Sequence, residues 1–488
     1  MGELNESALM KTITDTEVRS IIERVRQKVG TSPGAPPAGR PSPPPTGGAG
    51  IHATVDEAVT ACNAAFVAYR ACGLDARHRI VDRVRGLMRE HAQELAEMAH
   101  SETGLGRAED KLKKNMLVIE KTPGPEDLEP QTWTGDCGLT LTEPAPFGVI
   151  GAITPTTNPT ATIINNTIAG ISAGNGMVFN VHPNAKAVSV HTIRLINQAI
   201  VEAGGPPDLV ATVPEPTIES AQALMNHPGV RILLITGGPG VVEEARKTRK
   251  RAILAGPGNP PVVVDETADI DLAAREIVRG ASFDNNLICT DEKEVFVVAS
   301  VADQLLDAMR SSGGYVLAEH ELKKLEGLIF TSAAHDGTPG KINPKFIGQN
   351  AGAILAEIGI RNVDHIRLVV ADVPVDHSLV WTEQMMPVMP VARVPDVNRA
   401  ISLAIAAENG CCHTASIFSR NVDTITRMAR EIDVSIFVAN AATLAGLGDG
   451  GEGFTSFSIA SPTGEGLTRP RSLSRERRLA IAGGLRIV

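Results

Sequence analysis

Cys289 lies in segment 281–291, ASFDNNLICTD, among small, polar and aliphatic neighbours. A cysteine thiolate is the strongest common nucleophile that a side chain offers, and a backbone amide cluster or a helix start can lower the free thiol pKa of roughly 8.5. A cysteine in an apolar setting is more often a small buried hydrophobe. We take Cys289 as a candidate nucleophile because other parts of the chain carry the groups that such chemistry needs.

Three short apolar runs are each followed by a turn of small or polar residues. These turn residues are Thr154 and Pro155, His182 and Pro183, and Gly237 and Gly238. In an open α/β sheet, ligands bind at the carboxyl ends of the strands, so we expect the three turns to line one crevice. Each turn alone is best explained as an ordinary loop, whereas the three together favour a binding site. A dinucleotide is the natural occupant of such a crevice.

The elements that must position these groups show an alternation of helix and strand signals. Thr54 and Glu57 form a capping-box pair at the start of the globular part, and further helices are predicted over 75–87 and on to 98. Segment 133–142 alternates as a strand does, and 148–153 is an apolar run typical of a buried parallel strand. Helix and strand signals alternate from there to about residue 440, which predicts an α/β fold.

One glycine motif and the C-terminal stretch complete the pattern. Gly446, Gly448 and Gly451 match the dinucleotide fingerprint G-x-G-x-x-G, which needs a strand before it and a helix opening on it. We reject the match because further glycines continue into 454–456, which is no helix start, and we interpret the stretch as a flexible loop. Near the end of the chain, an arginine-rich segment precedes 479–481, which is typical of an edge strand.

Composition narrows the classes of function. The 488 residues give room for about three domains, and a net charge of -10 argues against a broad nucleic-acid surface. The six cysteines show no C-x-x-C spacing and two are adjacent, so we predict neither a metal site nor a disulfide framework, and a reduced, cytosolic setting. No signal peptide and no run of about 18 apolar residues is evident, so we expect neither secretion nor a membrane span.

The first thirty residues form a unit of their own. Thr14 and Glu17 make a capping-box pair, and the apolar residues after it fall at helical spacing, at Val18, Ile21, Ile22, Val25 and Val29. Segment 31–50 is rich in proline and glycine, which predicts an extended linker. An amphipathic helix that is tethered so loosely is better suited to binding another protein than to packing on its own domain.

Taken together, these motifs resemble those of the aldehyde dehydrogenase superfamily. The resemblance rests on Cys289 and on the segments 154–159 (TPTTNP) and 383–388 (EQMMPV), and it extends over nearly the whole chain from about residue 54. Within the superfamily the chain is most similar to the coenzyme A-acylating branch found as cargo in bacterial microcompartments, the propionaldehyde and acetaldehyde dehydrogenases. The segments that resemble this branch are 102–111 (ETGLGRAEDK), 179–186 (FNVHPNAK), 413–415 (HTA) and 461–468 (SPTGEGLT).

The resemblance implies a role for each site residue. Cys289 matches the nucleophile of the family and Asn158 its oxyanion-binding amide, a neutral donor that suits a tetrahedral oxyanion. Collapse of that intermediate passes hydride to the nicotinamide of NAD and leaves a thioester on Cys289. Glu383 matches the glutamate that hydrogen-bonds the nicotinamide ribose. The other expected cofactor-binding residues are those of the three turns, namely Thr154, Pro155, His182, Pro183, Gly237 and Gly238.

One departure from hydrolytic relatives is informative. Segment 254–261 reads LAGPGNPP, and Ala255 stands where those relatives carry a glutamate that activates water against the thioester. Neither Ala255 nor Gly256 can accept a proton, so hydrolysis of the thioester is expected to be slow. A thiol is a better nucleophile than water near neutral pH, and the resemblance implies coenzyme A as the acyl acceptor.

The resemblance also implies an organisation of the chain. We expect a Rossmann-type NAD-binding domain over 51–130 and 146–255, an α/β catalytic domain over 256–445, and a small β element for homo-oligomerisation, as a dimer or tetramer, over 131–145 and 466–488. Residues 1–30 would be an encapsulation segment and 31–50 its linker. Within the segment, residues 14–30 would bind shell or cargo proteins and place the enzyme in the lumen of a cytoplasmic microcompartment.

Two other functions were weighed against this interpretation. A hydrolytic aldehyde dehydrogenase would release free acid, and Ala255 disfavours it because no base stands at that position. A non-catalytic scaffold would use the terminal helix to gather cargo, and the joint presence of Cys289, Asn158 and Glu383 disfavours it. The sequence leaves open whether acetaldehyde, propionaldehyde or lactaldehyde is the substrate.

Overall fold

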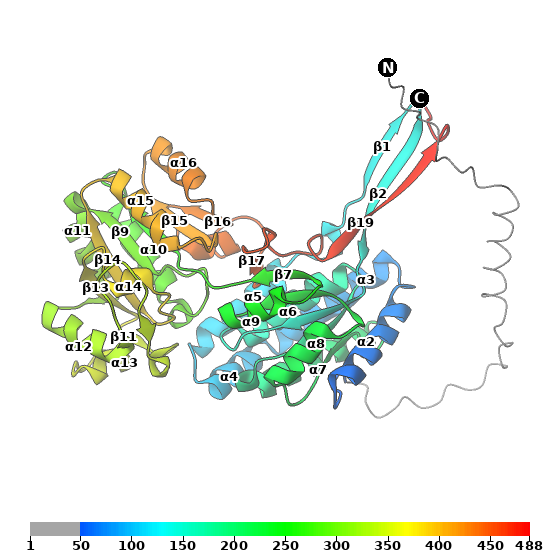
Figure 1. Cartoon of the computed structure of the whole chain (residues 1–488), viewed down its shortest axis with the longest axis horizontal. Coiled ribbons are helices and arrows are strands. Elements are labelled where there is room, and N and C mark those ends of the chain that lie inside the picture. The colour runs from blue at the N-terminus through cyan, green and yellow to red at the C-terminus, as the bar shows by residue number, and fades with distance from the viewer. Residues whose placement is uncertain (1–48) are drawn as a thin grey trace, which may run out of the picture. The chain divides into compact units, whose positions relative to one another are not determined.

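The computed structural model describes residues 49–488. The predicted helix within residues 1–30, and all of the linker 31–50 except its last two residues, lie outside the described residues. Two parallel sheets, each covered by helices on both faces, and one three-stranded antiparallel sheet make up most of the described part (Figure 1). The predicted α/β fold class is confirmed.

The first parallel sheet has five strands in the order β5-β4-β3-β6-β7. Its strands are β3 (Val149–Ile153), β4 (Gly176–Asn180), β5 (Val210–Thr212), β6 (Val230–Thr236) and β7 (Arg251–Ala255). The chain runs outward from β3 to β5 and then returns to β6 on the other side of β3, so the order of the strands reverses between β3 and β6. Ligand crevices of open α/β sheets lie at such a reversal, beyond the carboxyl ends of the strands.

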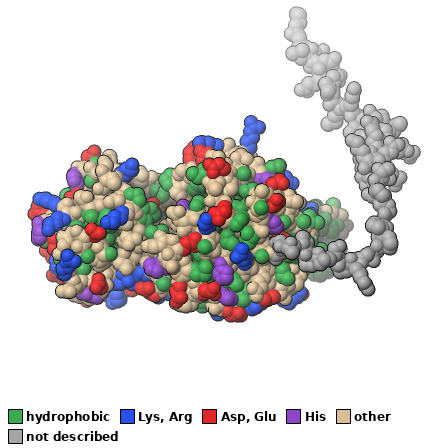
Figure 2. All heavy atoms as spheres, turned by 90° about the horizontal axis from the view of Figure 1, so that it is seen from below, with side chains coloured by type: hydrophobic (Ala, Val, Ile, Leu, Met, Phe, Trp, Pro, Cys, Tyr) green, Lys and Arg blue, Asp and Glu red, His purple; other side chains and the backbone are tan. Residues whose placement is uncertain are grey.

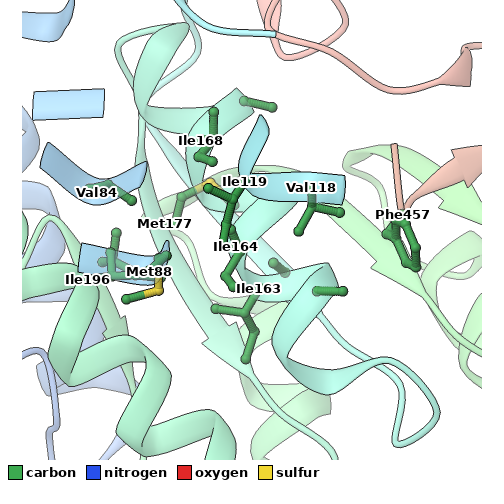
Figure 3. Packing of buried hydrophobic residues seen from close by; sticks show 14 of the residues in the cluster. Val84, Met88, Val118, Ile119, Ile163, Ile164, Ile168, Met177, Ile196 and Phe457 are labelled. Atoms are coloured by element: carbon green, nitrogen blue, oxygen red, sulfur yellow. The ribbon is translucent and has the colours of Figure 1, made fainter. Parts of the chain in front are cut away.

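Alternate residues of the five-stranded sheet point into two separate apolar clusters. One cluster joins the sheet to α2 (Val55–Tyr69), α8 (Ile218–Asn226) and α9 (Pro239–Arg246). The larger cluster joins the opposite face to α3 (Leu74–Glu90), α4 (Ala92–Thr103), α5 (Ala108–Lys121), α6 (Pro159–Ser172) and α7 (Lys186–Glu202). Figure 3 shows Ile119 of α5 close to Ile164 of α6 inside this cluster, so side-chain packing fixes how these two helices lie against each other.

The second parallel sheet has seven strands in the order β10-β13-β14-β9-β8-β15-β16. Its strands are β8 (Pro261–Val264), β9 (Glu294–Val298), β10 (Gly314–Val316), β13 (Leu368–Val373), β14 (Val388–Val394), β15 (Thr414–Phe418) and β16 (Ile436–Ala439). Helices α10 (Ile270–Ala281) and α11 (Ala299–Ser311) share one apolar cluster with this sheet. The cluster on the other face includes residues of α12 (Glu319–Ile329), α13 (Ala351–Glu357), α14 (Ser378–Trp381), α15 (Val397–Glu408) and α16 (Val422–Glu431).

The antiparallel sheet has the order β1-β2-β19, and it extends away from the five-stranded sheet (Figure 1). Its strands are β1 (Gln131–Gly135), β2 (Gly138–Pro146) and β19 (Ser474–Ala482). Trp133, Leu479 and Ile481 are large apolar side chains that this sheet leaves exposed. The edge strand predicted at 479–481 is confirmed as part of β19, whereas the division of the chain into domains stays a prediction.

Several local predictions can be compared with the structure. The hydroxyl of Thr54 accepts the backbone N–H of Glu57 at 3.2 Å and begins α2, while the Glu57 carboxylate accepts from Ala53. Segment 133–142 is not one strand, because a two-residue turn separates β1 from β2 and the alternation continues across the hairpin. The glycines at 446–451 are not followed by a helix, which agrees with their rejection as a dinucleotide fingerprint.

The remaining pairs of strands are short, namely β11 (Phe330–Ser332) with β12 (Lys341–Ile342), and β17 (Ile459–Ala460) with β18 (Gly466–Leu467). None of the helices within residues 49–488 has the length and apolar character needed to span a membrane. Acidic and basic side chains are interspersed over the face shown in Figure 2.

Candidate active site

A cleft of about 610 Å³ opens beyond the carboxyl ends of β3, β4 and β6. The structure brings all nine site residues named from the sequence into its lining: Thr154, Pro155, Asn158, His182, Pro183, Gly237, Gly238, Cys289 and Glu383. Their elements come from both parallel sheets, because Cys289 precedes β9 and Glu383 precedes β14. Residues that are up to 229 positions apart therefore meet in one cleft.

The segment before Cys289 has an unusual backbone. Asp284, Asn285 and Asn286 have φ values of 43°, 58° and 64°, a left-handed region that Asp and Asn tolerate better than other residues with side chains. Hydrogen bonds hold this conformation: the Asn286 amide donates to the carbonyls of Ala281 and Glu292, each at 2.9 Å. The fully buried Lys293 ammonium donates to the Asn286 carbonyl at 2.9 Å. Strain of this kind is typical of functional segments.

The Cys289 side chain is half-buried and lines the cleft. Burial, and then the negative charge of Glu383, raise the pKa of Cys289 to about 12, while the Lys293 ammonium opposes the rise. An amide cluster or a helix start can lower the pKa of a thiol, but here the pKa is raised because desolvation outweighs the nearby positive charge. The thiol is therefore protonated at neutral pH in this structure.

Asn158 is the N-cap residue of α6, yet its side chain makes no capping hydrogen bond. An N-cap asparagine normally accepts a backbone N–H of the first turn. Here Oδ1 accepts from the buried Lys114 ammonium at 2.5 Å instead, and Nδ2 donates to the Thr157 hydroxyl at 3.2 Å. The Asn158 amide therefore does not cap α6, and it lines the cleft as a hydrogen-bonding group.

Gly258 connects three groups of the site. Burial raises the pKa of the nearby Glu383, and the Lys293 ammonium and then the Gly258 backbone N–H oppose this rise. A Cβ at this position would lie 2.7 Å from the Cys289 carbonyl oxygen and 2.9 Å from Cγ of His413. Glycine is therefore needed here, because any side chain would push the nucleophile segment out of place.

The walls of the cleft fit a dinucleotide. The buried hydroxyl oxygens of Thr154 and Thr156 have no hydrogen-bond partner among residues 49–488. At the start of α9, Gly238 is the N-cap residue with no capping side chain, and a Cβ added to it would meet nothing within 4 Å. Unfilled backbone donors at a helix start suit a phosphate. Apolar side chains, including those of Ile218 and Val241, line the same cleft and suit an adenine ring.

His182 lies in the turn after β4, where its Nδ1 accepts the backbone N–H of Asn184 at 3.1 Å. Burial lowers the pKa of His182, so the imidazole is neutral at pH 7. A neutral ring places no fixed positive charge at this point of the cleft.

Ala255 is the last residue of β7 and lines the cleft with a methyl group. Its polar contact is made by the backbone, whose carbonyl accepts the N–H of Gly237 at 3.2 Å. Among the described residues that line the cleft, Glu383 is the one carboxylate.

A second cavity, of about 330 Å³, shares Ile288 and Phe457 with the cleft. Its lining combines apolar and charged side chains. The residues that line it are Lys113, Met116, Leu117, Glu120, Lys121, Phe283, Ile288, Leu444, Gly448, Asp449 and Phe457. Ile288 directly precedes Cys289, so the second cavity borders the segment that carries Cys289.

Sequence reasoning assigned no role to Lys111, Lys114 or Asp284, although these buried charged residues contact the Asn158 turn and the Cys289 segment. One signal was available. Positions 111, 114 and 118 follow helical spacing, and Val118 is apolar, so the two lysines lie on the buried face of α5. Lysines at core positions are rare unless they are paired.

Comparisons with known proteins agree with this site. The family model described as "Aldehyde dehydrogenase family" matches residues 48–316 and 366–453. The acetylating acetaldehyde dehydrogenase EutE of Salmonella typhimurium is 48% identical over 440 residues, which are 90% of this chain and 94% of that protein.

Two solved structures are also similar to this chain. The propionaldehyde dehydrogenase of Rhodopseudomonas palustris, with bound CoA and an acylated cysteine, has a TM-score of 0.87 at 45% identity and covers 90% of this chain and 99% of its own. The propionaldehyde dehydrogenase of the Clostridium phytofermentans fucose utilisation bacterial microcompartment has a TM-score of 0.87 at 42% identity and covers 90% of this chain and 100% of its own. These matches confirm the resemblance seen in the sequence, and the chain belongs to the aldehyde dehydrogenase family.

Proposed function

We propose that this protein oxidises a short-chain aldehyde with NAD and coenzyme A to an acyl-CoA, through a thioester on Cys289. The observation that carries the proposal is one cleft that joins Cys289 and Asn158 to the three strand-end turns, with Ala255 in place of a general base. The similarity to acylating relatives supports the same reaction.

In the first step the Cys289 thiol loses its proton to solvent and the thiolate attacks the aldehyde carbon, so that a C–S bond forms and the carbonyl oxygen becomes an oxyanion. The Asn158 Nδ2 and the Cys289 backbone N–H are the neutral donors assigned to that oxyanion, and loss of one such donor typically costs about 100- to 1,000-fold in rate. NAD, when bound, supplies the hydride acceptor that the oxidation requires. The cysteine then carries the acyl group as a thioester.

In the last step the thiolate of coenzyme A attacks the thioester carbonyl. A new C–S bond to coenzyme A forms, the bond to Cys289 breaks, and the electron pair returns to the Cys289 sulfur. Water competes poorly, because the Ala255 methyl cannot take a proton from it. The thioester therefore persists until a thiol reaches it.

We assign NAD as the oxidant. The residues assigned to bind it are Thr154, Pro155, His182, Pro183, Gly237, Gly238 and Glu383. The neutral His182 imidazole supports NAD over its 2′-phosphorylated form, because it offers no positive charge to a second phosphate. An NADP preference in initial-rate assays would contradict this assignment.

We propose that the aldehyde enters through the second cavity, past Ile288 and Phe457. The limited volume of about 330 Å³ and the apolar Ile288 and Phe457, which line both cavities, support short aliphatic aldehydes such as acetaldehyde and propionaldehyde. Replacing Phe457 with alanine should widen the passage and shift preference, measured as kcat/KM, toward longer aldehydes.

The test of the proposed reaction is NADH formation from a panel of short aldehydes with and without coenzyme A. With coenzyme A, turnover should continue and acyl-CoA should accumulate. Without it, about one NADH per active site should form and the reaction should then nearly stop, because deacylation limits turnover. Sustained production of free acid without coenzyme A would contradict the acylating assignment and favour the hydrolytic alternative.

We further propose that residues 14–30 bind a shell or cargo protein of a bacterial microcompartment and place the enzyme in its lumen. The amphipathic sequence pattern and the Pro/Gly-rich segment 31–50 support this role, as does the relative from a microcompartment. Deleting residues 1–45 should leave kcat and KM nearly unchanged and abolish co-localisation with shells. A double change of Ile21 and Ile22 to glutamate should give the same localisation defect without shortening the chain. Entry of the truncated enzyme into shells would refute the role.

The organisation of the chain is proposed as it was expected from the sequence, with the NAD-binding domain over 51–130 and 146–255 and the catalytic domain over 256–445. The β element over 131–145 and 466–488 is assigned to a dimer or tetramer interface, because its edge strand exposes Leu479 and Ile481. Replacing both residues with glutamate should lower the mass in light scattering. An unchanged mass would place the interface elsewhere.

A further inference from the structure

Asn158 owes the orientation of its amide to one buried lysine. Lys114 is 2% exposed, and its Nζ lies 2.5 Å from Asn158 Oδ1. An ammonium group only donates hydrogen bonds, so the amide must present its oxygen to Lys114 and turn Nδ2 away from it. One Nδ2 hydrogen then reaches the Thr157 hydroxyl at 3.2 Å, which leaves the other for a further acceptor.

We propose that Lys114 is a positioning residue of the oxyanion site. It locks the Asn158 amide so that Nδ2, rather than Oδ1, faces the oxyanion that forms when Cys289 attacks a carbonyl. Without this contact the amide could rotate by half a turn, or return to capping α6 as N-cap asparagines usually do. Either movement removes a donor from the oxyanion. The inference deepens the proposed function and rests on its assignment of Asn158.

The fold holds Lys114 and Asn158 together through two independent connections. The first is apolar packing, because Val118 of α5 and Ile163 of α6 belong to the same buried cluster (Figure 3). The second is a polar network. Lys111 donates to the Thr157 carbonyl at 3.2 Å and to the Asp284 carboxylate at 3.1 Å, and Lys114 donates to the same carboxylate. Asp284 lies five residues before Cys289, so this network joins the nucleophile segment to the oxyanion donor.

The charges of the network favour an anion beside Asn158. Two buried ammonium groups, on Lys111 and Lys114, face the single carboxylate of Asp284. The nearby Asp110 balances only part of this charge, because Arg367 at 2.7 Å and Lys113 at 3.0 Å also pair with it. Burial, and then the charge of Lys114, lower the pKa of Lys111 to about 8, while Asp284 opposes this change.

A different role must be separated from this one, namely that Lys114 only neutralises Asp284. Replacing Lys114 with methionine removes the charge and the donor at nearly constant length, and it leaves Lys111 paired with Asp284. The matched control is Lys111→Met, which lies one turn earlier on α5 and contacts Asp284 but not the Asn158 side chain. A purely structural role predicts similar effects in the two variants.

Two reactions at Cys289 make the distinction, and neither needs aldehyde, NAD or coenzyme A. Iodoacetamide alkylates the sulfur as iodide leaves, and no oxyanion forms. p-Nitrophenyl acetate acylates the same sulfur through a tetrahedral oxyanion, after which p-nitrophenolate leaves and gives an absorbance burst. Alkylation is followed by the mass of the Cys289 peptide, because the chain has six cysteines. These assays keep their meaning even if the proposed dehydrogenase reaction is wrong.

We expect Lys114→Met to slow the acylation burst by about 100-fold, the effect of losing an oxyanion donor, and to leave alkylation within about threefold of the wild type. Lys111→Met should slow the burst much less. In an Asn158→Ala background, Lys114→Met should cause almost no further loss, because the two residues act through one donor. Lys114→Gln, which keeps an N–H donor, should recover part of the burst rate. Equal losses in both reactions, an unchanged burst rate, or full additivity with Asn158→Ala would overturn the proposal.

Discussion

Replacing Glu383 with glutamine should make Cys289 react faster near neutral pH. Burial and the Glu383 carboxylate are the two largest causes that raise the pKa of Cys289 to about 12. Glutamine keeps the shape of the side chain and a hydrogen-bonding oxygen but removes the negative charge. The thiolate is then less disfavoured, so a larger fraction of Cys289 is ionised at a given pH.

The expected size follows from the pKa. A thiol with a pKa of about 12 is about one ten-thousandth ionised at pH 8, so the alkylation rate of the wild type should rise about tenfold per pH unit from pH 7 to 10 without a plateau. If removing the carboxylate lowers the pKa of Cys289 by about one unit, the alkylation rate at each pH in this range increases about tenfold. Burial also raises the pKa of Glu383, so this gain should shrink at low pH, where Glu383 becomes protonated in the wild type.

The measurement is the rate of iodoacetamide labelling at the Cys289 peptide, by mass spectrometry, across that pH range. Glu383→Asp is the matched control, because it keeps the charge and changes only the length of the side chain. A plateau at or below pH 9 in the wild type would show that the thiol is not held neutral by burial. Slower labelling in Glu383→Gln than in Glu383→Asp would show that the carboxylate acts as a base toward Cys289 rather than as a repelling charge.

Three other changes test the site. Cys289→Ala should abolish acyl-CoA formation and leave the far-UV circular dichroism spectrum unchanged, and a folded variant with near-full activity would remove Cys289 from the mechanism. Gly258→Ala should lower kcat by about 100-fold, because its Cβ would lie 2.7 Å from the Cys289 carbonyl oxygen. Gly327→Ala is the control and should leave kcat unchanged, because no atom lies within 4 Å of a Cβ at that position. Equal kcat values for the two variants would refute the steric reason. Burial lowers the pKa of His413 from about 6.5 to about 4. The free energy of unfolding of the wild type, measured by urea denaturation, should therefore fall by up to about 3 kcal/mol relative to His413→Gln as the pH drops through this window. The same pH dependence in both proteins would contradict this prediction.

The direction of the His413 effect follows from where protons bind. Above about pH 6.5 the imidazole is neutral in both the folded and the unfolded chain, and the residue adds no pH dependence. Between about 6.5 and 4 the unfolded chain takes up a proton that the folded site excludes, which favours unfolding. Glu292, whose pKa burial raises to about 7, acts in the opposite direction, so the comparison with His413→Gln is needed to isolate His413.

The parts of the fold and site that could be predicted from the sequence depend on residues that are close together in the chain. The apolar run 148–153 became the fully buried β3, and the turn residues Thr154, His182 and Gly237 came together because carboxyl ends of parallel strands lie on one edge of a sheet. The family resemblance was equally local, since short segments around Cys289 and Glu383 carry it. The same reasoning misjudged 133–142, because a hairpin between two strands preserves the alternation that a single strand shows.

Contacts between distant segments were out of reach of such patterns. Lys114 and Asp284 are 170 positions apart, and Lys114 and Asn158 are separated by 44. The spacing of Lys111, Lys114 and Val118 shows that the lysines share the buried face of α5, but it does not show which carboxylate or amide they meet. The steric need for Gly258 is hidden for the same reason, since it depends on the positions of Cys289 and His413.

The raised pKa of Cys289 and the buried lysines are two consequences of one environment. Removing water from the cleft makes an isolated thiolate costly, and it also strengthens every hydrogen bond that remains. Lys293 donates a hydrogen bond to the segment that carries Cys289, and Lys114 donates one to the amide of Asn158. These contacts fix the two groups before any charge develops. In the proposed mechanism, charge passes from the sulfur to the carbonyl oxygen, which the donors of these two groups stabilise, whereas the charge of Glu383 disfavours the thiolate. A site that works in this way stabilises the oxyanion more than the resting thiolate, which is the condition for lowering a barrier rather than for binding a ground state.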